Sequence, residues 1–156
     1  MIDTLQTFAA SLPEALTWVG VFLVAAIPMV ESYFGSVIGV LIGLHPAVAI
    51  GMAVLGNILS MLIVVLSAHA VRRKVTARAE PREESARRRK LRERFDRYGV
   101  AGVSLAGQAL LPSQITSAAM VSFGASKNAV VFWQIISIIL WGVAFGVLAT
   151  LGVSFL

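Results

Sequence analysis

The chain has 156 residues, of which 58% are hydrophobic and only 13% are charged, and its mean hydropathy is +0.85. This composition excludes an ordinary water-soluble domain, because too few residues are polar to cover its surface. There is no cysteine, which excludes a disulfide framework and thiol chemistry. We therefore expect one all-α integral membrane domain over residues 1–156.

The first residues predict a short amphipathic helix over 1–13, because apolar side chains recur at helical spacing as far as Pro13. A first repeat over 17–71 follows, and it begins with an apolar stretch over 18–30. As a helix, this stretch spans roughly 20 Å, which is less than the ~30 Å hydrocarbon core of a bilayer. A second short apolar stretch covers 34–44, so neither stretch is expected to cross the membrane alone.

Pro28 and Glu31 separate these two short stretches. Proline lacks a backbone N–H and clashes with the preceding turn, so Pro28 predicts a helix break. After a turn at His45 and Pro46, residues 47–71 supply an apolar segment long enough for a full crossing.

A basic linker over 72–98 comes next and carries 12 of the 13 lysines and arginines of the chain. Glutamates four residues before arginines, and apolar residues on one side, predict a surface helix resting on anionic headgroups. We interpret it as a cytoplasmic connection that obeys the positive-inside rule, and not as a nucleic-acid site.

A second repeat over 99–156 shows the same order of segments. A short apolar stretch over 100–111 is broken at Pro112, a second covers 115–123, and a full span covers 129–153. Pro28 and Pro112 hold equivalent places, although the residues themselves are not repeated.

These patterns predict two inverted repeats, each a re-entrant helical hairpin plus one transmembrane helix, linked by a basic cytoplasmic helix. In this scheme the protein is multi-pass in the inner membrane, both termini lie outside, and both breaks lie near the midplane. The alternative is four simple crossings, with 17–44 and 100–123 as single kinked helices and both termini in the cytoplasm. The acidic N-terminal segment and Lys127, which falls inside under the hairpin scheme, favour the hairpins.

Polar residues next to the breaks are the candidate binding residues. Glu31 and Ser32 open the second limb of the first hairpin, where Glu31 is either a helix cap or a proton- or cation-binding group. In the second hairpin the corresponding residues either cap the broken helix or hold an anionic headgroup such as phosphate: Gln108, Ser113, Gln114 and Thr116.

Asn57 and Gln134, on the two long spans, either join helices by hydrogen bonds or contact a substrate. The glycines of "GSVIGVLIG", Gly35, Gly39 and Gly43, are expected to pack helices closely or to form a dimer contact, and Gly142 and Gly146 repeat this spacing. His45 and His69 are interpreted as interfacial. No nucleophile motif, phosphate loop or metal-ligand cluster appears in the sequence, so we expect no enzymatic activity, cofactor or metal.

The sequence also resembles the small multidrug export protein family, and more widely the DedA/VTT membrane proteins. The resemblance covers roughly 17–153 and is carried by Glu31 behind a proline, Gly56-Asn57, the charged middle segment and "RYGVAGVSLAGQALLP". It implies paired re-entrant hairpins and a transport role. For the DedA relatives, it implies transport of lipids such as undecaprenyl-phosphate carriers. Tyr33 stands where the export family usually has an arginine, and "LLPSQIT" has none of the arginines of the DedA hairpin.

Three functions therefore remain open. The first is a transporter or flippase for a lipid or amphipathic compound, working by alternating access at a midplane site. The second is a cationic-drug/proton antiporter that uses Glu31, and the third is a non-transporting membrane scaffold. The expected partners are membrane lipids, an amphipathic or lipid-phosphate substrate and a second copy of the chain.

Overall fold

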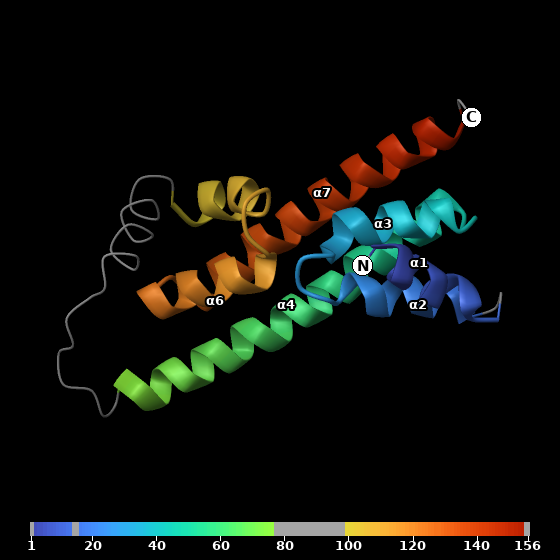
Figure 1. Cartoon of the computed structure of the whole chain (residues 1–156). Coiled ribbons are helices and arrows are strands. Elements are labelled where there is room, and N and C mark those ends of the chain that lie inside the picture. Colours follow the sequence, from blue (N-terminus) through green and yellow to red (C-terminus); the bar gives the residue numbers. More distant parts are fainter. Residues whose placement is uncertain (1, 14–15, 77–98, 155–156) are drawn as a thin grey trace. The chain divides into compact units, whose positions relative to one another are not determined.

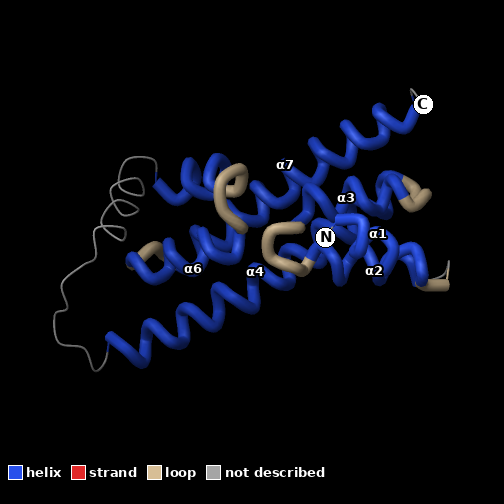
Figure 2. The backbone as a smooth tube through the Cα atoms, viewed as in Figure 1, coloured by secondary structure: helices blue, strands red, loops and turns tan. Residues whose placement is uncertain are grey.

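All regular structure among residues 2–13, 16–76 and 99–154, which a computed structural model describes, is helical (Figures 1 and 2). A further helix, over residues 99–107, is not labelled in Figure 1. The labelled helices are α1 (Ile2–Ser11), α2 (Thr17–Ala25), α3 (Glu31–Leu41), α4 (Pro46–Thr76), α6 (Ser113–Phe123) and α7 (Lys127–Ser154). Residues 77–98 of the predicted basic helix over 72–98 lie outside the described residues.

The chain forms two compact units, and both long helices contribute to each of them. Unit 1 contains Met1–Ser60 and Ser137–Leu156, and unit 2 contains Met61–Ile136. Unit 1 therefore holds α1, α2, α3, the first half of α4 and the second half of α7. Unit 2 holds the second half of α4, the helix over 99–107, α6 and the beginning of α7.

The helices α4 and α7 are long and apolar enough to cross a membrane. They have 31 and 28 residues, which corresponds to roughly 46 and 42 Å of helix. Only 33% and 22% of the residues in their most apolar windows are buried inside the protein. A core helix of a soluble protein would be mostly buried, so this exposure is typical of helices that face lipid.

In unit 1, α2 and α3 form a helical hairpin and lie side by side (Figure 1). A Cβ atom built on Gly35 would lie 2.6 Å from Cβ of Ala25, and one on Gly39 would lie 3.3 Å from Cγ2 of Val21. The order of these contacts makes the two helices antiparallel. The chain therefore turns back between them, unlike the alternative of one kinked helix over 17–44.

Small residues of α3 also pack it against the two long helices of unit 1, α4 and α7. On the α4 side, a Cβ on Gly35 would lie 3.1 Å from Cβ of Ala53, and one on Gly39 would lie 2.6 Å from Cβ of Ala49. On the α7 side, Ser32 and Ser36 of α3 face two glycines of α7, Gly142 and Gly146. Such small residues at four-residue spacing allow backbones to approach closely.

Gly43 differs from the expected packing role. It follows the end of α3, its φ is +88°, and no atom of the described residues lies within 4 Å of a Cβ built on it. Glycine adopts this left-handed conformation without the steric penalty of a side chain, so Gly43 serves to end α3.

Unit 2 contains a second hairpin, formed by the helix over 99–107 and α6, with a loop between them (Figure 2). A Cβ built on Gly107 would lie 3.3 Å from Cγ2 of Thr116, so the two helices touch near the loop. At its other end α6 stops at Gly124, whose φ is +107°. The helix α6 has 11 residues, which is roughly 17 Å and less than a membrane crossing.

Candidate functional site

The break between α2 and α3 carries a buried acid on a strained backbone. Pro28 lies in this break, and Glu31, the first residue of α3, is fully buried, with an exposed fraction of 0%. Met29 and Glu31 have φ values of +78° and +56°, a region that side-chain-bearing residues rarely adopt. Such strain persists only where the surrounding structure enforces it, and it is concentrated at functional sites.

Asn57 lies on α4 at the level of Glu31. In the antiparallel register of α3 and α4, Gly35 lies opposite Ala53. One helical turn further along, residue 31 therefore lies opposite residue 57. The Asn57 side chain is also fully buried. Next to it, Gly56 lets α4 touch the backbone of α2, because a Cβ there would collide with the carbonyl group of Phe22. Unit 1 therefore brings together two of its predicted polar residues.

Ser32 joins α3 to α7. Its hydroxyl donates a 2.8 Å hydrogen bond to the carbonyl of Ile138, while Ser36 donates to the carbonyl of Ser32 in its own helix. The Ser32 proton is thus used inside the protein, and only the oxygen lone pairs remain to accept a bond from a ligand.

In unit 2, the predicted polar residues gather at the loop end of the second hairpin. Gln108 begins the loop, and Ser113, Gln114 and Thr116 lie in the first turn of α6, after Pro112. All four polar side chains are buried. The Thr116 hydroxyl donates a 3.1 Å bond to the carbonyl of Pro112. The first N–H groups of a helix have no partner within it, so this turn is electropositive.

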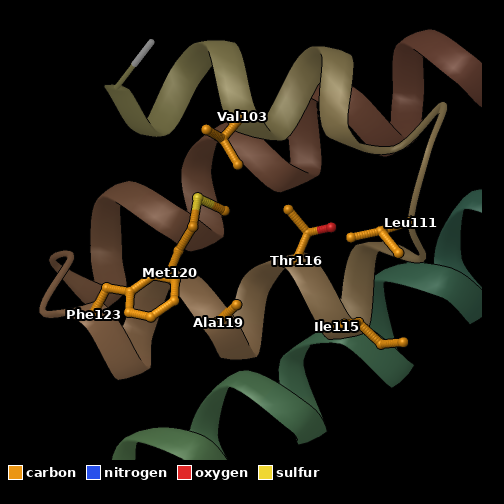
Figure 3. Close-up of a pocket in the computed structure, with 7 residues that line it drawn as sticks. All are labelled: Val103, Leu111, Ile115, Thr116, Ala119, Met120 and Phe123. Atoms are coloured by element: carbon orange, nitrogen blue, oxygen red, sulfur yellow. The ribbon is translucent and has the colours of Figure 1, made fainter. Parts of the chain in front are cut away.

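A small apolar groove lies beside this turn, between the helix over 99–107 and α6 (Figure 3). Val103 and Met120 point toward each other across it, Leu111 and Ile115 line its end near the loop, and Thr116 is its one polar lining residue. The groove is small, with a volume of about 30 Å³, and it lies close to the polar first turn of α6.

Gln134 is the remaining predicted residue, and it is fully buried in unit 2. Neither polar atom of its side chain has a hydrogen-bond partner among the described residues. Buried amides normally find such partners, so Gln134 is an exception among the described residues. Gln134 belongs to unit 2, whereas Glu31 belongs to unit 1.

An aromatic cluster next to Glu31 was not predicted from the sequence. Tyr33 of α3 packs against Trp141 and Phe145 of α7, with ring centroids 6.5 and 5.5 Å apart, and Phe34 joins the group. The available signal was the four-residue spacing of Trp141 and Phe145 on an apolar helix. That spacing is common in membrane spans, and only the contact with α3 distinguishes these rings.

Comparison with known families identifies a match. The profile of the family described as "Putative small multi-drug export protein" matches residues 31–148, which is most of the chain. Comparisons with curated proteins and with solved structures returned no match. The matched range begins at Glu31, the buried acid that opens α3, and includes both polar groups described above.

Proposed function

Because the chain belongs to the small multi-drug export protein family, we propose that it is a membrane transporter that moves an amphipathic compound or a lipid by alternating access. The observation that carries this proposal is the burial of Glu31 at the first turn of a short helix that follows a break. An ionisable residue inside an apolar membrane protein is costly, and it usually marks an ion or substrate pathway.

The proposal places α4 and α7 across the membrane and makes both hairpins re-entrant. α2 and α3 have nine and 11 residues, or roughly 14 and 17 Å, so each reaches only partway through the ~30 Å core. In this arrangement the ends of the short helices lie inside the membrane, where irregular backbone is tolerated only when it is buried in protein or lines a wet cavity.

Each hairpin then has its own role in binding. Glu31 and Asn57 of unit 1 provide the ionisable and amide groups that exchange a proton or bind a cation during transport. The first turn of α6 in unit 2, with Ser113 and Gln114, holds the polar part of the substrate, and the apolar side chains beside Thr116 contact its apolar part. Polyprenyl-phosphate carriers have this combination of a phosphate and a long hydrocarbon chain.

Nothing in this arrangement needs enzymatic chemistry, and we propose that the protein is not an enzyme. We also propose that it works as a homodimer in the cell membrane, because one copy has few helices with which to enclose a transport path.

Transport by the purified protein in liposomes tests this function. Two fluorescent probes are used, a labelled polyprenyl phosphate whose accessibility to an external quencher is followed, and ethidium, whose release is followed. Wild-type protein should move at least one probe faster than protein-free liposomes do. Glu31→Gln should slow that transport by about tenfold or more, because it removes the titrating group.

Asp3→Asn is the matched control, because Asp3 is an exposed acid on α1. It should leave transport unchanged, and both variants must elute from a sizing column as the wild type does. The proposal is wrong if wild-type protein moves neither probe, or if Glu31→Gln transports at the wild-type rate.

A further inference from the structure

We propose that the second half of α7 slides along the other helices of unit 1, and that the Ser32 hydroxyl holds it in the position that the structure describes. This inference rests on the proposed transport function and names the helix contact that moves during transport. Three observations carry it: the kind of atoms that meet at each helix contact, a hydrogen bond from α3 to α7, and a strained backbone next to that bond.

The helices α2, α3 and α4 are joined through their backbones. A Cβ built on Gly35 would lie 3.3 Å from Cα of Ala25, so α3 meets the backbone of α2. A Cβ built on Gly39 would lie 3.1 Å from Cα of Ala49, so α3 also meets the backbone of α4. Backbone atoms cannot rotate out of the way, so these three helices are expected to move together as one rigid group.

The contacts of α7 with this group are made by side chains. The three atoms nearest to a Cβ built on Gly142 belong to the side chains of Val54 and Ser32. Those nearest to a Cβ built on Gly146 likewise belong to side chains of α3 and α4. Side chains can change rotamer, so a helix that is packed through them can slide by a small amount without losing contact. The surface between α7 and the rigid group is therefore the place where unit 1 can shear.

A hydrogen bond crosses this surface. The Ser32 hydroxyl, in the first turn of α3, donates a 2.8 Å bond to the carbonyl of Ile138 in α7. Ser32 is fully buried, and a hydrogen bond in such an apolar environment is stronger than the same bond in water. The bond therefore favours the position of α7 that the structure describes.

The backbone next to this bond favours a different position. Met29 and Glu31 have φ values of +78° and +56°, and each of these conformations costs free energy in a residue with a side chain. Such a conformation persists only where surrounding contacts enforce it, and the Ser32 bond lies directly beside it. When this bond breaks, the turn before α3 can relax, and α7 is released. Two opposing contributions therefore set the balance between two positions of α7.

Distances between pairs of spin labels test this movement in the full-length protein in lipid nanodiscs. Because the chain contains no cysteine, two introduced cysteines alone carry the labels. Leu23→Cys with Leu148→Cys reports the distance from α2 to α7 and should give two distance populations. Leu23→Cys with Leu55→Cys reports the distance from α2 to α4 and should give one. The side chains at all three positions are exposed, so the labels disturb little packing.

Two substitutions should shift the populations of the α2–α7 pair in opposite directions. Ser32→Ala should raise the ratio of the second population to the described one by about threefold or more, because it removes the bond to α7. Met29→Gly should lower this ratio by about twofold or more, because glycine relieves the strain of the described position. Ser36→Ala, which removes a bond within α3, and Met29→Ala, which keeps the Cβ atom, are the matched controls and should leave the ratio unchanged.

A single distance population for the α2–α7 pair in Ser32→Ala would overturn the sliding contact, as would shifts in the same direction in Ser32→Ala and Met29→Gly. Such a result would leave the proposed transport function intact, because that function is tested separately by Glu31-dependent transport. Conversely, the expected shifts in a protein that moves neither transport probe would support the sliding contact and refute the transport function.

Discussion

Gly35 of α3 and Ala25 of α2 lie so close that a Cβ atom on Gly35 would be 2.6 Å from the Cβ of Ala25. The same added atom would be 3.3 Å from the Cα of Ala25, which is part of the backbone and cannot rotate away. Even one methyl group is therefore too large here, and the hairpin that places Glu31 depends on a glycine at this position.

Gly35→Ala should destabilise the protein by about 1–3 kcal/mol, because the added methyl group forces α2 and α3 apart. Gly51→Ala is the matched control, since Gly51 lies within α4 and no atom of the described residues lies within 4 Å of a Cβ built on it. That change should leave stability unchanged or raise it by up to ~1 kcal/mol through helix propensity. Thermal unfolding in detergent measures both, and equal effects of the two substitutions would contradict the hairpin contact.

Ser32→Ala should lower stability by about 0.5–1.5 kcal/mol, because it removes the hydrogen bond from α3 to the Ile138 carbonyl. Ser36→Ala should have a smaller effect, since the hydrogen bond that the Ser36 hydroxyl makes in the described part of the chain lies within its own helix. Thermal unfolding of the two variants under the same detergent conditions makes the comparison. A larger loss for Ser36→Ala would show that the bond between helices contributes little.

The helices themselves could largely be predicted from the sequence. Residues 47–71 and 129–153 were expected as long spans, and the structure has Pro46–Thr76 and Lys127–Ser154. Apolar length determines these elements, and it is visible in a sequence. The left-handed conformations of Met29 and Glu31 were not predicted, because no glycine marks them and only the surrounding packing enforces them.

Contacts between helices were harder to predict than the helices. The GxxxG spacing indicated close packing at Gly35 and Gly39, whereas Gly43 follows the end of α3 and has no close neighbour among the described residues, so its predicted packing role stays a prediction. The burial of Glu31 agrees with its position in an apolar stretch. The aromatic cluster depends on which face of α7 meets Tyr33, and a single sequence does not specify this face.

Met29→Gly should raise stability by up to ~1 kcal/mol, because glycine adopts a φ of +78° without a steric penalty. The greater flexibility that glycine gives the unfolded chain offsets part of this gain. The Met29 side chain is 60% exposed, so little packing is lost. Met29→Ala is the control and should bring no gain, because alanine keeps the Cβ atom. Thermal unfolding that shows the same change for both would contradict the strained conformation at this position.

Single cysteines should report the membrane topology directly, because the chain contains no cysteine of its own. With a membrane-impermeant maleimide added to spheroplasts, re-entrant hairpins predict labelling of Ser154→Cys and no labelling of Ser126→Cys. Four simple crossings predict the reverse. His45→Cys should be labelled in both arrangements and serves as the positive control, and labelling of Ser126→Cys would refute the second re-entrant hairpin.

Arg72→Gln should lower the stability of unit 2 by about 0.3–1 kcal/mol, because it removes a cation from the C-terminal end of α6. Nη2 of Arg72 lies 3.3 Å from a Cβ built on Gly124, the residue that ends α6, so the guanidinium lies near the negative end of the helix dipole. Arg73→Gln is the control, since Arg73 is exposed on α4 and should contribute little. The difference between the two variants in thermal unfolding should shrink as salt rises, because salt screens charges near the surface. A difference that is independent of salt would mean that Arg72 acts through packing of its aliphatic stem, and not through its charge.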